Sequence, residues 1–521
     1  MRRQVSLCVG ALVLAACSDP AERISSGRSL DLGSATTLTS ADDGSAQVQA
    51  EIAAFDASSA ASPGAHAVDP SLAALLTGAA PGQLEVIVTY DGSQTTDFAL
   101  AHQLTGLGAG IIRFKHLPMM FALGSPDAVR QMSALPGVRS VYLNKPLHHF
   151  LHESNQTIKA DQAWALGYTG GGVGAAILDS GVDGLYSPGL TFGSKTIANV
   201  KFIASVKDLV TFDPDDPGPR PAGALFLENL ANSETSSGHG THVAGMVAGT
   251  GGGSVAGWYR GVAPGANIIG IGTGDVLVIF WALAGFDYVL DRQQEYNIKV
   301  VNNSWGTNGS FDPNDPINVA TRKVHDAGVT VVFAAGNCGR GGDPDCPPEG
   351  ESQLNPYSVA PWVIGVSATC KIGVQDPTNS QSQCADPVSG RAPVLANFSS
   401  VGVPHTIYKP DIGAPGVRIV STRSSLGVTV DALAASNDAR FCNISVQHLQ
   451  YYTCISGTSM ATPNIVGVVA LMQGAAGGRL SPDQVLGIMR KTATHLDGYE
   501  DWEVGAGLVN ALAAVQRAAR R

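Results

Sequence analysis

The sequence predicts an α/β protein with two folded parts: a parallel sheet with helices on both faces, preceded by a small ferredoxin-like α+β domain. Three observations support this prediction. Residues 84–143 alternate short apolar strands with two helices in the order βαββαβ. From about residue 160 to residue 515, apolar strands alternate with longer helical segments, which is typical of a parallel sheet. In addition, 44% of the residues are hydrophobic and 14% are charged, so the chain can bury a large core.

The overall composition narrows the classes of function. The 521 residues carry a formal net charge of −11, which argues against nucleic-acid binding, since such proteins present a basic face. Glycine is abundant, with 62 residues, and this abundance needs a structural reason. The longest apolar run past the N-terminus, residues 276–286, is too short to span a bilayer as a helix. We therefore expect contact with a membrane only through the N-terminus.

The N-terminus has the layout of an export signal. Arg2 and Arg3 precede the apolar run 5–16. Residues 14–17, Leu-Ala-Ala-Cys, resemble the lipobox of bacterial lipoproteins, in which Cys17 would be acylated and become the first mature residue. An ordinary cleaved signal is the alternative. We predict a signal peptide with a lipobox at 1–17 and export to the bacterial cell envelope or the medium, with a lipid anchor before maturation.

Residues 18–80 differ in composition from both folded parts. They are rich in Ser, Ala, Asp, Gly and Thr, which predicts a flexible linker with at most one short helix around residues 71–76.

The elements of the small domain follow in order. Ser125 is an expected N-cap, because Pro126 stands at the first helical position and Asp127 lies in the first turn. The order of elements does not by itself identify a function, since this fold serves many. Strands are expected at 84–90, 111–116, 119–123 and 138–143, and helices at 95–104 and 125–135.

The large domain places its candidate site at one edge of the sheet. In parallel α/β sheets, ligands and catalytic groups lie beyond the carboxyl ends of the strands. Strands are expected at 174–178, 298–303, 329–335 and 362–368, and helices at 276–296, 317–326, 459–473, 481–491 and 508–519.

Two polar residues near strand ends are candidates for catalysis. Asp179 ends an expected strand and is followed by Ser-Gly, although a turn-forming aspartate would show the same pattern. His239 stands between Gly238 and Gly240, which allow another backbone or a substrate to come close. His239 and His242 could also share a helix face as a metal pair, but no nearby acidic or cysteine ligand completes such a site.

Ser459 opens an apolar helix after a Gly-Thr turn. The N–H groups at a helix start suit an oxyanion beside a nucleophile, whereas a simple helix cap is the alternative role. The segment is not the GxSxG elbow of α/β-hydrolases, because residue 461 is Ala, and this argues against a serine esterase.

Together these motifs resemble those of the subtilase family, the relatives of subtilisin and proteinase K. The order Asp, His, Ser is the subtilisin order. Residues 301–306, 332–337 and 409–416 are similar to further family segments, and the small domain resembles the inhibitory prosegment of these enzymes. The resemblance covers about residues 84–515 and implies a subtilisin-like sheet.

The resemblance implies a secreted serine endopeptidase that forms an acyl-enzyme. Ser459 would attack the peptide carbonyl, His239 would transfer the proton, and Asp179 would orient the imidazole. Asn337 and the Ser459 N–H would hold the oxyanion. The residues implied to bind an extended polypeptide substrate are Ser304, Trp305, Gly306, Ala334, Ala335 and Gly336.

The resemblance also implies an autoprocessed zymogen. Its expected parts are the signal 1–17, the linker 18–80, an inhibitory prosegment 81–149 and a catalytic domain 155–515. Cleavage is expected within 148–155, so any lipid on Cys17 would stay with the discarded part. The expected partners are polypeptide substrates and the chain's own prosegment, and we expect a monomer.

No cofactor is expected for the chemistry, whereas structural calcium is common in the family. The candidate calcium ligands are Asp411 and the acids at 213–216. The long segment 185–234 has three alternative roles: surface decoration, a substrate-gating loop or a calcium loop. Asn464 stands where the family often has His, and we expect structural consequences only. A non-catalytic envelope binding protein on this scaffold would lack a triad or oxyanion residue, and none is missing.

Six cysteines lie in the C-terminal part as three close sequence neighbours. In an exported protein disulfides are expected, and six cysteines allow fifteen connectivities. We favour the local pairing, in which the first bridge would brace the loop after Asn337 and the third would close the loop before Ser459. The favoured pairs are Cys338–Cys346, Cys370–Cys384 and Cys442–Cys454.

Overall fold

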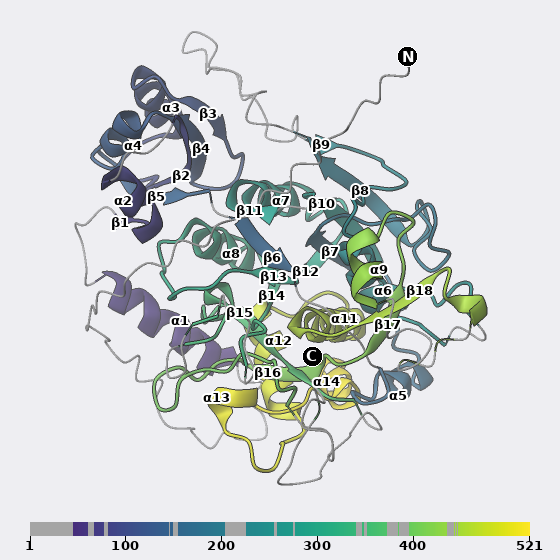
Figure 1. Cartoon of the computed structure of the whole chain (residues 1–521). Helices are drawn as coiled ribbons and strands as arrows, with labels where there is room; N and C mark the ends of the chain where they lie inside the picture. The colour runs from purple at the N-terminus through teal and green to yellow at the C-terminus, as the bar shows by residue number, and fades with distance from the viewer. Residues whose placement is uncertain are drawn as a thin grey trace, which may run out of the picture.

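The protein has two folded parts that lie side by side in the computed structural model (Figure 1). Cys17 and the acids at 213–216 lie outside the residues that the structure describes. Within the described part of the chain, no helix is long and apolar enough to cross a membrane. The described residues are 45–60, 67–77, 82–144, 146–149, 155–203, 226–254, 258–274, 277–339, 346–347, 352–371, 384, 395–434, 442, 444 and 446–521.

The small domain contains the expected βαββαβ order and one additional edge strand. Its five-stranded sheet has the order β1-β5-β2-β4-β3, in which β1 pairs parallel with β5. The Thr96 and Ser125 side chains accept hydrogen bonds from Ala99 N and Ala128 N and so cap the two predicted helices. The elements are β1 (Ala67–Val68), α2 (Pro70–Thr77), β2 (Leu84–Tyr90), α3 (Asp97–Gly106), β3 (Gly110–Arg113), β4 (Met119–Gly124), α4 (Pro126–Met132) and β5 (Val138–Leu143).

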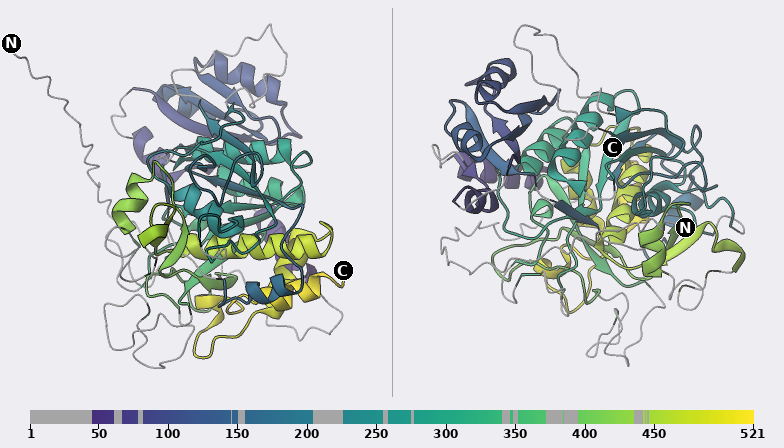
Figure 2. Two further views of the ribbon diagram at one scale, coloured as in Figure 1. Left: turned by 90° about the vertical axis from the view of Figure 1, so that its right-hand side faces the viewer. Right: turned by 45° about the horizontal axis from the view of Figure 1, so that its top comes forward.

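The two faces of the small sheet have different partners. Because side chains alternate along a strand, Val86 and Val88 of β2 enter the core of the small domain, whereas Ile87 joins the core of the large domain. On β4, Phe121 turns to the large domain in the same way and lies against Phe280, with ring centroids 4.1 Å apart. The small domain therefore docks on the large one through an apolar sheet face, and the right-hand view of Figure 2 shows it at one side of the large domain.

The large domain is built on an eight-stranded sheet. Its order is β16-β15-β14-β12-β7-β10-β8-β9, and every pair is parallel except β8 with the short edge strand β9. The central strands are fully buried, as expected of a sheet covered on both faces. The strands are β7 (Gly174–Asp179), β8 (Thr196–Phe202), β9 (Phe226–Leu227), β10 (Asn267–Gly272), β12 (Ile298–Asn303), β14 (Thr330–Ala334), β15 (Val363–Thr369) and β16 (Ile412–Pro415).

Helices cover this sheet from both sides. On one face α6 (His239–Ala248) and α11 (Thr458–Ala475) pack together on the central strands, α14 (Ala511–Ala518) packs on α11, and α12 (Pro482–Thr492) contacts α14 and β14. On the other face lie α7 (Ile279–Arg292) and α8 (Pro316–Asp326). The subtilisin-like α/β architecture expected from the sequence is thus present. The remaining helical elements are α5 (Ala160–Ala165), η4 (Pro356–Ser358), α9 (Val428–Ala434), η5 (Val446–His448) and α13 (Asp501–Val504).

The segment 276–296, expected as one helix, is helical over only part of its length. Its first described residues form the short strand β11 (Leu277–Val278), and the helix α7 begins only at Ile279. The reason is a pairing far along the chain: β11 pairs with β6 (Pro146–His149), which also pairs with β13 (Trp305–Gly306). Figure 1 shows β6 on the large domain, next to β11 and β13. A second small sheet joins β17 (Ile419–Thr422) to β18 (Tyr452–Ile455).

The expectation of a flexible linker with at most one short helix at 18–80 is wrong for part of that range. Besides α2 and β1, the structure contains the sixteen-residue helix α1 (Ser45–Ala60). Its alanine-rich sequence favours a helix, and two apolar residues four apart, Val48 and Ile52, are buried against the large domain. Tertiary packing therefore determines the helical structure of a segment whose composition alone is typical of a linker.

All three disulfides expected from sequence proximity are present. The Cα–Cα distance is 5.4 Å for Cys338–Cys346 and 5.9 Å for Cys370–Cys384. The third bridge, Cys442–Cys454, ties the loop after α9 to β18.

Candidate active site

Asp179 and His239 form a buried pair at the carboxyl end of β7. His239 Nδ1 lies 2.6 Å from Asp179 Oδ1, and the side chains are 2% and 0% exposed. The same carboxylate oxygen accepts a hydrogen bond from Ser180 N at 2.8 Å. A buried charge needs such partners, so this carboxylate fixes both the orientation of the imidazole and the nitrogen that carries its proton.

The glycines beside His239 permit close backbone crossings. Gly238 adopts a left-handed conformation with φ of 75°, and a Cβ there would lie 2.6 Å from the Cα of Gly427. A Cβ on Gly240 would lie 2.2 Å from the carbonyl oxygen of Gly181. The Gly240 contact brings the start of α6 against the turn that follows Asp179, and the Gly238 contact brings it against Gly427, which explains the glycines on both sides of His239.

The first turn of α6 is capped from outside the helix. Its N-cap is Gly238, which has no side chain to accept the first N–H groups. Instead Ser180 Oγ accepts from Gly240 N at 2.9 Å, and Glu234 Oε2 accepts from Thr241 N at 2.9 Å. Ser180 thus bonds the helix that begins with His239, and its own N–H bonds Asp179, so one residue ties the pair together.

Glu234 is a buried carboxyl that the sequence analysis did not single out. Its Oε2 also accepts from Thr241 Oγ1 at 2.5 Å, and its Oε1 accepts from Thr235 N at 3.1 Å. Burial raises its pKa to about 7, although hydrogen bonds from Ser180 and Thr241 act in the opposite direction. The only signal in the sequence was an isolated acid five residues before His239.

Ser459 lies at the start of α11 and is joined to the corner between β12 and β13. Its hydroxyl donates to the Ser304 carbonyl at 2.8 Å, and Ser304 Oγ donates to the Ser459 carbonyl at 2.8 Å. The second bond has a cause in the sequence. Pro463 lacks the N–H that would bond Ser459 O within the helix, so the Ser304 hydroxyl takes its place. Both serines are fully buried.

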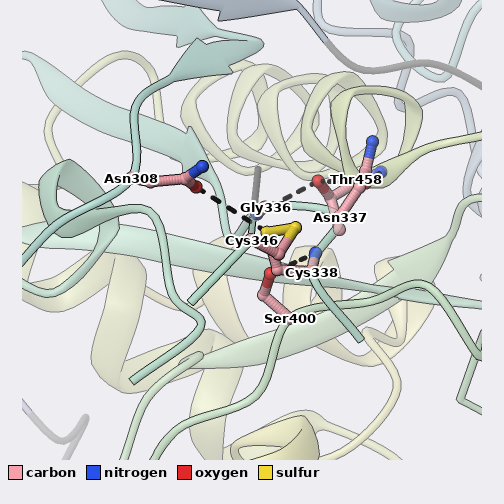
Figure 3. The surroundings of a disulfide bond; sticks show 7 residues. All are labelled: Asn308, Gly336, Asn337, Cys338, Cys346, Ser400 and Thr458. Atoms are coloured by element: carbon pink, nitrogen blue, oxygen red, sulfur yellow. Dashed lines mark hydrogen bonds between the residues drawn. A yellow bond between two sulfur atoms is a disulfide. The ribbon is translucent and has the colours of Figure 1, made fainter. Parts of the chain in front are cut away.

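Asn337 faces the start of α11 and is only partly buried. Its amide oxygen accepts from Thr458 N at 2.9 Å and from Thr458 Oγ1 at 3.0 Å (Figure 3). Because the oxygen is occupied in this way, the amide nitrogen is the part of the group that can donate to a ligand. Thr458, which the sequence analysis passed over, therefore sets the orientation of Asn337.

The segment around Asn337 is fixed on both sides. Before it, Gly336 has a φ of 110°, and its N–H donates to Thr458 Oγ1 at 3.2 Å. After it, Cys338 N donates to Ser400 Oγ at 2.9 Å, and the Cys338–Cys346 disulfide closes the loop (Figure 3). The loop after Asn337 is thus held by hydrogen bonds from its backbone N–H groups as well as by the expected disulfide.

The six residues expected to bind substrate form two short segments, 304–306 and 334–336. Ser304, Trp305 and Gly306 border the strand β6, with Trp305 opposite His149 and Gly306 opposite His148. Trp305 offers only its backbone, because its ring is fully buried and its Nε1 donates to Leu178 O at 2.8 Å. Ala334 and Ala335 are fully buried, and their carbonyls accept from Asn355 Nδ2 and Asn355 N at 2.9 and 2.7 Å.

The alternative of a metal pair at His239 and His242 finds no support. His242 is fully buried, and burial lowers its pKa to about 3, an effect that the neighbouring His239 strengthens. Throughout the described part of the chain, no group of three or more His, Cys, Asp or Glu side chains is arranged to hold a metal ion.

Asp411 does not fit the role of a calcium ligand. Its Oδ2 accepts from Lys409 Nζ at 2.6 Å and from Gly365 N at 2.7 Å, and its Oδ1 accepts from Arg490 Nη2 at 2.6 Å. With a fully buried side chain and two cationic partners, it has no oxygen left for a metal. Asn464, the other departure from the family pattern, donates to Pro415 O and Met460 O at 3.0 and 2.8 Å, which is a structural role.

Comparisons with known proteins agree with this architecture. The family model described as "Subtilase family" matches residues 170–507. Serine protease AprX of Bacillus subtilis is 29% identical over 425 residues, which cover 77% of this chain and 79% of that protein. An extracellular protease of Xanthomonas campestris pv. campestris is 29% identical over 419 residues, covering 75% of this chain and 61% of the relative. Subtilisin NAT of Bacillus subtilis subsp. natto is 28% identical over 418 residues, covering 78% and 82%.

A solved structure extends the likeness to the fold. The crystal structure of fervidolysin from Fervidobacterium pennivorans, described as a keratinolytic enzyme related to subtilisin, matches with a TM-score of 0.57 and 21% identity. The match covers 84% of this chain and 61% of that one. At this identity the likeness concerns the fold alone.

Proposed function

The chain belongs to the subtilase family of serine proteases, and from this premise we propose that it is an exported endopeptidase with the triad Asp179, His239 and Ser459. The observation that carries the proposal is the buried contact of 2.6 Å between His239 Nδ1 and Asp179 Oδ1. It leaves Nε2 of the imidazole as the nitrogen that can act as a base. Subtilases need no cofactor for catalysis, and none enters the mechanism below.

The proposed reaction is acyl transfer through Ser459. The Ser459 hydroxyl gives its proton to His239 as its oxygen attacks the peptide carbonyl, and His239 then returns the proton to the leaving amine. Asp179 holds the imidazole in the required tautomer and stabilises its cation. In this structure the hydroxyl donates to the Ser304 carbonyl, so it must rotate toward His239 when substrate binds.

The Asn337 amide nitrogen and the Ser459 backbone N–H are proposed to hold the oxyanion. Support comes from the two hydrogen bonds of Thr458 to the Asn337 oxygen, because they aim the nitrogen side of the amide away from the protein framework. In subtilisin, loss of one such donor lowers kcat by about 10²–10³. The Cys338–Cys346 bridge and Ser400 would keep this donor in place before substrate arrives.

The segment 81–149 is proposed to be an inhibitory prosegment. Residues 146–149 pair with β13 on one side and β11 on the other, as an extended substrate would by adding a strand. The last paired residue, His149, lies opposite Trp305, the residue that directly follows Ser304. We place the maturation cut within 148–155, and the mature catalytic domain at 155–515.

The N-terminal signal completes the proposal. Arg2, Arg3 and the lipobox-like residues 14–17 direct the chain out of the cytoplasm, with Cys17 as the lipidated residue. Relatives named as extracellular proteases support export. After the cut the lipid remains with the N-terminal part, so the mature monomer acts on polypeptides free of the membrane.

The test compares the intact masses of the wild-type chain and a Ser459→Ala variant. The wild type is expected to shed residues 1 to about 150, and the variant should remain full-length because it has no nucleophile. Ser194→Ala is the matched control, since Ser194 is an exposed serine of the same domain whose hydroxyl bonds only Thr191 O. Equal processing of wild type and Ser459→Ala would show that another protease makes the cut and would refute self-processing.

A further inference from the structure

The helix α1 belongs to the N-terminal part of the chain but packs on the large domain. Its apolar residues Val48 and Ile52 are 1% and 7% exposed and lie in the core of the large domain, whereas the small domain has a separate core. The helix runs along α12, and Figure 1 shows it apart from the small sheet. The N-terminal part thus holds the large domain at two separate places.

A partly buried charge network forms the centre of this second contact. Arg490 Nη1 donates to both carboxylate oxygens of Glu51, at 3.0 and 3.2 Å, and Arg490 Nη2 donates to Asp411. The side chains of Glu51 and Arg490 are 15% and 21% exposed. Lys409 completes the network by donating to Asp411.

The charges of the network balance only when α1 is present. Lys409 and Arg490 supply two positive charges, and Asp411 and Glu51 supply two negative charges. Without α1, the half-buried guanidinium of Arg490 loses both Glu51 oxygens that Nη1 bonds, and the apolar surface under Val48 and Ile52 is exposed to water. Both changes cost free energy, so the surface around Arg490 favours an occupied state.

The first contact lies far from this network. There Asp287 of α7 accepts the backbone N–H groups of Lys115 and His116 at 2.9 and 2.6 Å, next to the apolar face of the small sheet. Two contacts on one connected fragment bind more tightly than either alone, because the second forms at a high effective concentration.

We propose that the α12 surface around Arg490 is a docking site for α1, and that α1 keeps the N-terminal fragment on the catalytic domain after the maturation cut. The inference rests on the proposed zymogen, because retention of the fragment matters only if the chain is cut. Release of the N-terminal fragment then takes two steps, the cut itself and the dissociation of α1 from α12. The occupant is chemically defined: a helix with one carboxylate between two apolar residues four positions apart.

The experiment uses the full chain with Ser459→Ala and a recognition site for a specific protease inserted between His149 and Asn155. After the added protease cuts, the large domain is held on beads by a C-terminal tag, and the N-terminal fragment that remains is measured over time. The chain does not have to cut itself in this assay. A failure of self-processing, tested separately above, is therefore distinguishable from a failure of this inference.

Glu51→Lys is expected to release the fragment at least ten-fold faster than the parent chain, because it reverses the charge that faces Arg490. Glu51→Gln keeps the size of the side chain, and we expect an intermediate rate. Gln49→Lys is the matched control, since it introduces the same lysine side chain at an exposed position of α1, and its rate should stay within two-fold.

The large domain has the same sequence in all these variants, so differences in release come from α1 alone. Equal release from the parent, Glu51→Gln and Glu51→Lys chains would overturn the inference. If Glu51→Lys does not fold, the Glu51→Gln rate decides, and a rate equal to that of the parent overturns the inference in the same way.

Discussion

Two regions of the large domain hold a buried carboxyl group in opposite ways. Beside the proposed triad, the Glu234 carboxyl accepts hydrogen bonds from neutral N–H and O–H donors, and burial raises its pKa to about 7. At the amino end of β16, burial would likewise raise the pKa of Asp411, but Lys409 and Arg490 reverse the effect and lower that pKa. Cations stabilise the ionised form of Asp411, whereas the neutral donors around Glu234 do not offset the effect of burial on its pKa.

The difference follows from what each region must do. The Asp411 network joins β16, α12 and α1, so its strong pairs hold three elements in one arrangement. Glu234 instead replaces the missing cap of the helix that starts at His239. A cation at this place would compete with His239 for Asp179, so a neutral set of donors suits a site whose imidazole is proposed to gain and lose a proton.

The largest expected effect separates catalysis from stability. Asp179→Asn removes the charge that fixes the His239 tautomer, and in the Ser-His-Asp template this change lowers kcat by about 10⁴. We expect the folded state to persist, because the amide still fills the same space. The measurement is kcat on a chromogenic peptide, made with chains matured through the inserted protease site and freed of the N-terminal fragment.

A normal kcat in Asp179→Asn would mean that the buried pair is structural. The matched comparison is Asp411→Asn, which should leave kcat within a few-fold, since the residue lies on the far side of the sheet.

The smaller effect concerns how the stability of the fold depends on pH. As the pH rises, the Glu234 carboxyl should lower the stability, whereas the Asp411 carboxyl should raise it. Glu234 has a folded pKa of about 7, above its ordinary value of 4.5, so its stabilisation is complete below pH 4.5 and is lost as the pH rises to about 7. Asp411 has a lowered pKa, so its stabilisation is present above its ordinary value of 3.8 and is lost as the pH falls through the folded value.

Two variants in the Ser459→Ala chain test this contrast by urea unfolding between pH 2 and 8. Asp411→Asn should cost about 3–5 kcal/mol at pH 7, because the buried Lys409 loses its carboxylate partner. Glu234→Gln should flatten the fall in stability between pH 4.5 and 7, which amounts to at most about 1.4 kcal/mol per pH unit. A Glu234→Gln curve parallel to that of the parent would contradict the raised pKa.

Much of this arrangement could be predicted from the sequence because its signals are local. Strands with uninterrupted apolar runs, such as Ile298–Asn303, and helices with clear caps, such as the one after Ser125, appear where they were expected. The three disulfides were found in the same way, since each joins near neighbours.

The features that escaped the sequence analysis depend on distant partners. The strand β6 exists because β11 and β13 lie on either side of it, and β11 in turn shortens the expected helix at 276–296. The helix α1 depends on a surface more than 400 residues away, since Glu51 and Arg490 are 439 positions apart. Thr458 and Glu234 act by orienting other residues, and the sequence does not show which groups they face.

The central claim is that Ser459 is a nucleophile activated by His239. The most direct test treats the matured protein with a fluorophosphonate, a reagent that reacts with activated serines, and maps the adduct by peptide mass spectrometry. We expect one adduct on Ser459 in the wild type and none in a folded His239→Ala variant. An adduct on another serine, or no adduct on a folded wild-type protein free of its N-terminal fragment, would contradict the account.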